Sequence, residues 1–146
     1  MASSSGHPAI EIRPVGPGDA DLLGRVAEGV FDAPVDPKRL AAYLASTGHH
    51  LVVAVTGGEV VGQVAAVVHH HPDKPTELYV DEVGVAPAHR RHGIAQRMLA
   101  AMLELGRELG CEEAWVGTEP DNQAARRLYE SAGGVAESFL MYVYKL

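Results

Sequence analysis

The sequence predicts a single mixed α/β domain, and three observations lead to this fold class. Two runs rich in β-branched residues flank the Gly57-Gly58 pair, a pattern typical of a tight β-hairpin. A strand, a helix and a second strand follow over residues 78–118, and such a unit requires a parallel crossover. Two helical patterns precede the hairpin. In 146 residues these elements predict one mixed central sheet flanked by about four helices.

The N-terminal part predicts a short edge strand over residues 10–15 and two helices. The run DADLLGRVAEGVF, beginning at Asp19, has apolar residues at helical spacing and an aspartate at its start. Pro37 is suited to open the second helix, PKRLAAYLAS, with Asp36 as its cap.

The C-terminal half predicts alternating strands and helices. LYVDEVGVAP is a strand that contains Gly84, and a glycine inside a strand often marks a bulge or the path of a ligand along the backbone. A helix is expected over residues 94–109, followed by the strand EEAWVGT and by a helix capped by Asp121 or Asn122. The last twelve residues, VAESFLMYVYKL, are expected to form a terminal strand.

Composition narrows the function classes. With 47% hydrophobic and 21% charged residues, and no apolar run near the roughly 20 residues of a membrane span, we expect a soluble protein without membrane association. A net charge of −7 argues against non-specific nucleic-acid binding and favours cationic partners. Cys111 is the single cysteine, which excludes an internal disulfide. The start MASSSGHPAIEI lacks a secretory pattern, so we expect a cytoplasmic location and fraying of residues 1–8.

The stretch APAHRRHGIAQRM, residues 86–98, gathers positive charge in this acidic chain. It joins a strand to a helix, where unpaired backbone amides and the helix dipole favour an anion. Gly93 and Ala95 leave room for the anion, and Arg90, Arg91 and His92 add donors around it. A surface turn with solvated arginines is the alternative. The phosphate-loop and dinucleotide fingerprints are both missing from the sequence.

Two matched motifs give this turn a family context. Arg90, Gly93 and Ala95 fit the pattern Q/R-x-x-G-x-G/A, and some thirty residues later Asn122 precedes the helical LYE of residues 128–130. In these residues the chain resembles the GNAT family of acetyl-CoA-dependent N-acetyltransferases. The stretches FDAPVDP, HHLVVAV and YVDEVGVAPAHRRHGIA make it most similar to the aminoglycoside 3-N-acetyltransferases.

The resemblance implies a GNAT fold in which two strands splay apart beneath the pantetheine arm of acetyl-CoA. It also implies a set of cofactor-binding residues, namely Val83, Gly84, Val85, Arg90, Arg91, His92, Gly93, Ile94, Ala95, Asn122 and Tyr129. The hydroxyl of Tyr129 would protonate the leaving thiolate, unless Tyr129 is simply a core tyrosine. Asn122 is equally suited to cap its helix.

Carboxylates near the cleft are candidates for the general base and for the acceptor site. Glu82 is the first choice for the base. Strict alternation would put Glu82 and Gly84 on one face and Asp81 on the other, so both carboxylates can face the cleft only if the strand bulges; otherwise one of the two is misassigned. An edge carboxylate in a salt bridge is the alternative. A cationic substrate would be bound by the acidic set Asp81, Glu82, Glu119 and Asp121.

These observations predict an N-acetyltransferase whose acceptor amine attacks directly in a ternary complex. The acceptor is expected to be a cationic small molecule, an aminoglycoside antibiotic in particular, which would make the protein a resistance enzyme. Polyamines, peptides and protein lysines are alternative acceptors, and a non-catalytic acyl-CoA sensor is an alternative of another class. A homodimer is possible. The consecutive residues His69, His70 and His71 lack the i, i+4 spacing of a helical zinc pair, so no metal site is expected.

Overall fold

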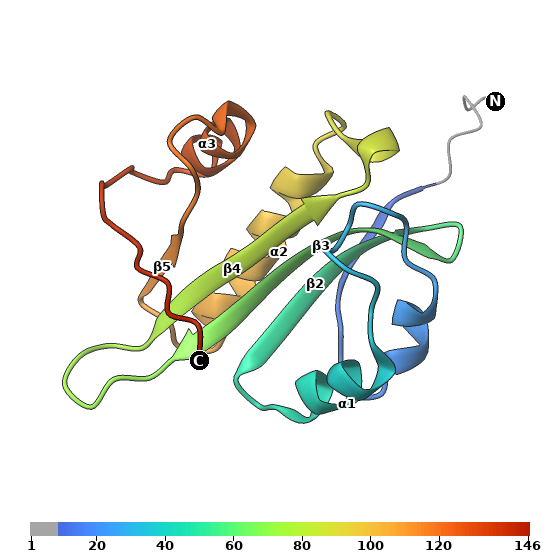
Figure 1. Cartoon of the computed structure of the whole chain (residues 1–146), viewed down its shortest axis with the longest axis horizontal. Coiled ribbons are helices and arrows are strands. Elements are labelled where there is room, and N and C mark those ends of the chain that lie inside the picture. The colour runs from blue at the N-terminus through green and yellow to red at the C-terminus, as the bar shows by residue number, and fades with distance from the viewer. Residues whose placement is uncertain (1–8) are drawn as a thin grey trace.

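The computed structural model describes residues 9–146, which form a five-stranded sheet flanked by helices (Figure 1). The expected fraying of residues 1–8 lies outside the described residues. The sheet order is β1-β2-β3-β4-β5, with all neighbours antiparallel except the parallel pair β4 and β5. The strands are β1 (Glu11–Pro14), β2 (His49–Thr56), β3 (Glu59–His69), β4 (Glu77–Val85) and β5 (Glu113–Val116). The mixed fold class is therefore confirmed.

Three α-helices and two short 3-10 helices complete the chain. Their bounds are η1 (Ala20–Gly24), α1 (Pro37–Ala45), η2 (Pro87–His89), α2 (Ile94–Glu108) and α3 (Gln123–Ser131). Pro37 opens α1 as predicted, and the Asp36 carboxylate accepts a hydrogen bond from the Arg39 amide at 2.9 Å. Figure 1 shows α2 behind the sheet, with α1 and the loop that precedes it in front.

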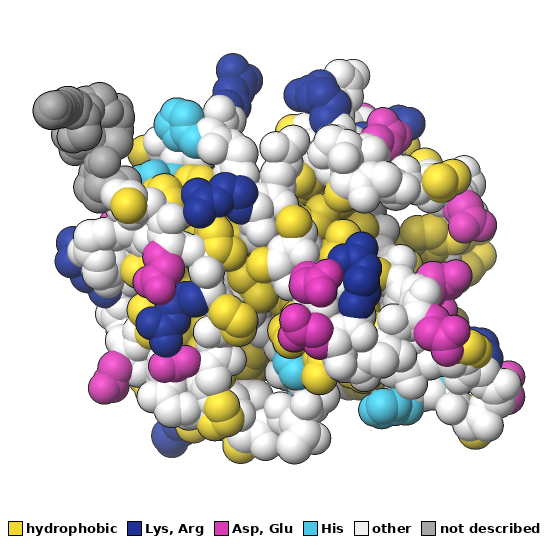
Figure 2. Space-filling view, turned by 180° about the vertical axis from the view of Figure 1, so that it is seen from behind, with side chains coloured by type: hydrophobic (Ala, Val, Ile, Leu, Met, Phe, Trp, Pro, Cys, Tyr) yellow, Lys and Arg dark blue, Asp and Glu magenta, His cyan; other side chains and the backbone are white. Residues whose placement is uncertain are grey.

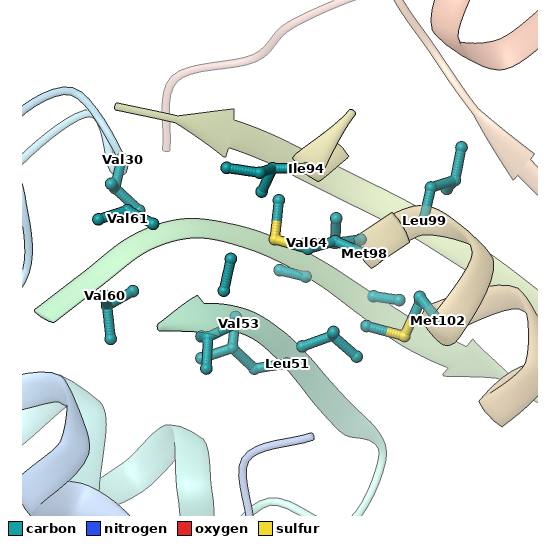
Figure 3. Packing of buried hydrophobic residues seen from close by; sticks show 14 of the residues in the cluster. Val30, Leu51, Val53, Val60, Val61, Val64, Ile94, Met98, Leu99 and Met102 are labelled. Atoms are coloured by element: carbon teal, nitrogen blue, oxygen red, sulfur yellow. The ribbon is translucent and has the colours of Figure 1, made fainter. Parts of the chain in front are cut away.

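The core lies between α2 and the central strands. Ile94, Met98 and Met102, which recur at helical spacing, are buried against Val64 and its neighbours (Figure 3). Packing at Gly62 is close, since a Cβ there would lie 2.8 Å from the Met98 methyl group, so a larger residue would require the Met98 side chain to shift. The buried residues of this sheet face are apolar and hold α2 in place.

Strand β4 contains a bulge at Asp81. In the ladder with β3, Ala66 pairs with Val80 and Ala65 pairs with Glu82, so Asp81 has no partner of its own. After the bulge, Gly84 pairs with Gln63, a residue of the sheet face opposite α2. The strand therefore contains the bulge that Asp81 and Glu82 need in order to share one face.

The predicted helix over Asp19–Phe31 is wrong beyond its first turn. Only Ala20–Gly24 is helical, as a 3-10 turn, and the chain then pairs with β3 through an isolated bridge between Val26 and Val60. The Ala27 amide donates to the Val60 carbonyl at 2.9 Å. Hydrogen bonds to a neighbouring strand thus replace those of the helix, while the predicted apolar position Val30 still becomes buried.

The predicted terminal strand is also absent. Residues 132–146 after α3 include no strand or helix, and their large apolar side chains are exposed, with Phe139 65% and Tyr144 81% exposed. Phe139 contacts the region of Gly117, just after β5. A run of β-branched and aromatic residues forms a strand only when a partner edge is available, and this segment pairs with none of the described strands. None of the helices among residues 9–146 has the length and apolar character to cross a membrane.

Candidate active site

The free edge of β4 is the first component of the candidate site. β5 pairs with β4 only over Glu77–Val80, whereas β3 pairs with β4 as far as Val85. Beyond Val80 the β5 side of β4 therefore has backbone amides and carbonyls with no strand beside them. The two strands part at this point, as the resemblance implied, and an extended ligand that carries amide groups can pair with the exposed backbone.

The turn between β4 and α2 provides a set of anion donors. Gly93 stands at the helix N-cap with φ +76°, a left-handed conformation that favours glycine. The first helical bond is donated by Arg97 to the Gly93 carbonyl at 3.1 Å, so the amides of Ile94, Ala95 and Gln96 have no acceptor within the helix. A glycine cap has no side chain to satisfy them, and they remain available to an anion.

Three exposed basic residues surround these amides: Arg90, Arg91 and His92. The Arg90 Nε donates to the Val85 carbonyl at 3.1 Å, which fixes the guanidinium at the end of β4 and leaves its terminal nitrogens free for an anion. Figure 2 shows Lys and Arg side chains along the upper edge of the molecule, above a recess with hydrophobic side chains at its base. Positive charge thus gathers at one edge of an acidic protein.

The opposite face of β4 carries the acidic residues. The bulge directs both Asp81 and Glu82 toward α1, where their charges act with burial to raise the pKa of Tyr43 to about 12. Burial, followed by the charge of Asp32, raises the pKa of Glu82, and burial raises that of Asp81. The Tyr43 hydroxyl donates to the His50 carbonyl at 3.0 Å. A carboxylate whose pKa is raised toward neutrality is a better proton acceptor for an amine.

Gln63 holds this acidic region in place, although the sequence analysis did not single it out. Its side chain is fully buried, and its Nε2 donates to the Val30 carbonyl at 3.3 Å. Interaction with its side-chain amide also lowers the pKa of the Glu82 carboxyl. A single polar residue within the apolar run VVGQVAAVV is the signal that could have identified it.

The structure gives a second reason for the glycine at position 84. A Cβ there would lie 2.1 Å from the Val30 carbonyl oxygen, so the loop that precedes α1 occupies the space beside Gly84 on this face. We expected Gly84 to mark a ligand path. The fold itself already requires the glycine, whereas the backbone of Val83, Gly84 and Val85 remains unpaired on the β5 side.

Two predicted residues of α3 have contrasting environments. The Asn122 side chain accepts a hydrogen bond from the Ala125 amide at 3.0 Å and is a helix cap. Tyr129 is half-buried, and burial raises the pKa of its hydroxyl. A link from Gln96 Nε2 to Ser131 Oγ at 3.4 Å ties α3 to the start of α2. Tyr129 therefore stands on the helix that faces the donor-rich turn.

The remaining predicted acidic residues lie apart from this group. Glu119 and Asp121 are exposed in the loop between β5 and α3, and the acidic charges that act on Glu82 are those of Asp32 and Asp81. Burial raises the pKa of Cys111, which keeps the thiol protonated and unsuited to act as a nucleophile.

Comparison with known families decides the affiliation. The profile of the acetyltransferase (GNAT) family matches residues 21–134, most of the described chain. The protein belongs to the GNAT family. The region matched contains β4, the donor-rich turn and α3, which together carry the features described above.

Individual relatives differ in what they acetylate. The GNAT protein is 35% identical over 104 residues to the N-alpha-acetyltransferase RimI of Mycobacterium tuberculosis, covering 71% of this chain and 63% of the relative. It is 25% identical over 85 residues to the aminoglycoside N(6')-acetyltransferase type 1 of Salmonella typhimurium, covering 56% and 59%. The match thus spans about three fifths of the length of each relative.

A solved structure confirms the fold. The aminoglycoside N-acetyltransferase AAC(6')-Iy in complex with CoA superposes with a TM-score of 0.78 at 18% identity, covering 98% of this chain and 99% of the other. Both aminoglycoside enzymes carry the 6' designation, so the 3-N subtype expected from sequence is not confirmed.

The donor set of this GNAT protein fits a coenzyme with a diphosphate and an amide-bearing arm. The uncapped amides of Ile94, Ala95 and Gln96, together with the exposed basic residues, suit the diphosphate. The unpaired edge of β4 suits the arm, because the backbone amides and carbonyls of the strand can hydrogen-bond the amide groups of the arm. The residues present are therefore compatible with acetyl-CoA, which enzymes of this family use.

Proposed function

We propose that this GNAT protein transfers the acetyl group of acetyl-CoA to an amine of a cationic small molecule, with an aminoglycoside as the first candidate. The observation that carries the proposal is the bulge at Asp81. It places two carboxylates of raised pKa on one face of β4, at the level where the β5-side edge of the strand becomes free. An amine acceptor and an acyl donor can therefore approach the same short segment from its two sides.

Acetyl-CoA supplies an activated thioester. The free amides of Ile94, Ala95 and Gln96, which follow the Gly93 cap, would bind its diphosphate together with Arg90, Arg91 and His92. The backbone of Val83, Gly84 and Val85 would pair with the arm, and the Val83 amide is the proposed donor to the thioester oxygen. Asn122 already caps α3, so only its side-chain NH2 remains for the arm.

Glu82 and Tyr129 are the proposed proton carriers. Glu82 would accept the amine proton, directly or through water, because its raised pKa brings its basicity closer to that of the acceptor. Tyr129 would protonate the departing thiolate, and its raised pKa keeps the hydroxyl protonated at neutral pH. The amine attacks directly in a ternary complex, since the protonated Cys111 offers no thiolate.

The acidic face favours a compact polycation as acceptor. Asp32, Asp81 and Glu82 lie close enough for their charges to act on one another or on Tyr43, and such a group attracts an ammonium-rich ligand. Glu119 and Asp121 are proposed as an outer acidic rim. A peptide N-terminus is the second candidate acceptor, because the RimI relative is an N-alpha-acetyltransferase.

A panel of acceptors tests the proposal. Thiol release from acetyl-CoA is measured with kanamycin, gentamicin, spermidine and an alanine-initiated peptide, and mass spectrometry locates the acetyl group. We expect saturable release with an aminoglycoside and a lower kcat/KM with the peptide. Turnover of the peptide alone would transfer the assignment to N-terminal acetylation. Heat on binding acetyl-CoA, without release for any amine, would support an acyl-CoA sensor instead.

A further inference from the structure

A cluster of two histidines and a glutamate lies at the opposite end of β4 from the candidate active site. His69, His71 and Glu77 each offer one ligand atom, and these atoms all lie within 4.8 Å of one another. We propose that these three side chains form a binding site for a divalent transition-metal ion of the zinc, cobalt or nickel type.

The sheet register brings the three residues together. His69, the last residue of β3, pairs with Glu77, the first residue of β4, so their side chains share a face. His71 lies two residues after His69, and its Nε2 approaches the Glu77 Oε1 at 2.6 Å. The rings of His69 and His71 stack, with centroids 4.3 Å apart. The helical i, i+4 test used on the sequence does not detect a site built across a hairpin.

Two of the three proposed ligands are largely buried. The His71 and Glu77 side chains are only 13% and 20% exposed, whereas His69 is exposed and can turn. A metal with bonds of about 2.0–2.2 Å to imidazole nitrogen and carboxylate oxygen holds its ligand atoms about 3.3 Å apart in a tetrahedral site. The short contact of His71 with Glu77 needs to open slightly, and the ligand atom of His69, which lies within 4.8 Å of the other two, needs to close by at most about 1.5 Å.

The chemistry of the ligands selects the ion. Two imidazoles and one carboxylate suit zinc, cobalt or nickel better than calcium or magnesium, which prefer oxygen ligands alone. Three protein ligands leave at least one coordination position for water. Glu113 of β5 pairs with Glu77 in the sheet and adds negative charge beside the cluster. The ion would join both ends of the loop over residues 70–76.

The neighbouring His70 provides a matched control within the same loop. Its Nδ1 lies 3.3 Å from the Thr76 hydroxyl and not among the three ligand atoms. A bound metal at the cluster would therefore require His69, His71 and Glu77, but not His70. Adventitious binding to a histidine-rich loop would depend on all three histidines alike.

Metal binding is measured by titrating Co²⁺ and Zn²⁺ into the untagged, metal-stripped full chain. Calorimetry gives stoichiometry and affinity, and Co²⁺ d–d absorption reports the coordination geometry. We expect one ion per chain, a higher Tm with zinc, and His70→Ala unchanged. His71→Ala and Glu77→Gln should each lose more affinity than the roughly 10- to 100-fold that loss of an outer-shell partner costs.

Two results would overturn the site. One is the absence of a saturable one-to-one isotherm in the wild-type chain, which would leave an ordinary His71–Glu77 hydrogen bond. The other is an equal loss of affinity in His70→Ala and His71→Ala. His71→Ala or Glu77→Gln could lose metal binding because the chain misfolds. His69→Ala is free of this ambiguity because the His69 side chain is exposed, and it should also abolish the Co²⁺ spectrum. Acetyl transfer should be unchanged in these variants, because β4 separates the cluster from Val85 by about 26 Å.

Discussion

The carbonyl oxygen of Val30 occupies the space in which a side chain at Gly84 would begin. The separation between this oxygen and an ideal Cβ is 2.1 Å, far below any real contact. The loop before α1 is thereby locked to β4, next to Glu82. Two segments distant in sequence meet here, and together they form the wall of the acidic face.

Gly84→Ala should therefore destabilise the protein by about 1–3 kcal/mol or more, because the added methyl group forces backbone to move. Urea unfolding measures the change. Gly24→Ala is the matched control, since a Cβ at Gly24 meets nothing within 4 Å. An alanine at position 84 without loss of stability would show that the Val30 loop is not held against β4.

Replacing Glu82 with glutamine separates catalysis from stability. We expect kcat to fall by about 10²–10⁴, the usual contribution of a general base. The pKa of Glu82 is higher in the folded protein than its ordinary value of 4.5. Ionisation of Glu82 therefore makes the wild-type fold less stable as the pH rises above 4.5, whereas glutamine does not ionise.

The Tm of Glu82→Gln should consequently exceed that of wild type at pH 7, and the difference should shrink toward pH 4. Thermal melts across this range measure it. Glu108→Gln, an exposed position on α2, serves as control for both activity and stability. An inactive variant that is also less stable at pH 7 would indicate a structural salt bridge instead.

Gln63→Leu tests whether Gln63 positions the proposed base. The interaction of its side-chain amide with Glu82 lowers the pKa of that carboxyl, so removing the amide should raise the Glu82 pKa further. The acidic limb of the kcat/KM profile should move to higher pH, a readout that simple loss of packing would not produce. A uniform fall in kcat/KM at every pH would restrict Gln63 to supporting the Val30 loop.

Tyr129→Phe should lower kcat while the KM for acetyl-CoA changes little, because only the proton donor is lost. Steady-state kinetics with the best acceptor provide the measurement. Tyr144→Phe, in the exposed C-terminal segment, is the control. Equal losses in kcat and in acetyl-CoA affinity would assign Tyr129 a packing role.

Arg90→Ala should weaken acetyl-CoA binding by about 1.5–3 kcal/mol, the range for a hydrogen bond to a charged group. Calorimetry with coenzyme A measures the change. Arg107→Ala is the control, because Arg107 pairs with Glu104 on the exposed side of α2. Unchanged affinity would transfer the phosphate contact to Arg91 or His92.

The sequence predicted correctly the elements that depend only on neighbouring residues in the chain. Asp36 and Pro37 define the start of α1, and the Gly57-Gly58 pair, both with positive φ, turns the hairpin. The free amides at the start of α2 are also local in origin, since they follow from a strand that leads into a helix with a glycine N-cap.

Elements that depend on distant partners were missed or misplaced. Helical spacing around Val26 did not reveal its bridge to Val60, because propensity contains no information on a strand that folds later in the sequence. The grouping of Tyr43 and Asp32 with Glu82 arises from tertiary packing for the same reason. Asp81 was named in advance, but its bulge is visible only in the ladder.

That bulge has an evolutionary implication. Since the ladder runs from Val80 directly to Glu82, Asp81 is a surplus residue whose side chain is not constrained by a cross-strand neighbour. Under the proposed function, a substitution at this single position would change the acidic face that receives the amine without disturbing the pairing of any other residue. A saturation library at codon 81 is consequently the smallest one expected to change acceptor preference while preserving the scaffold.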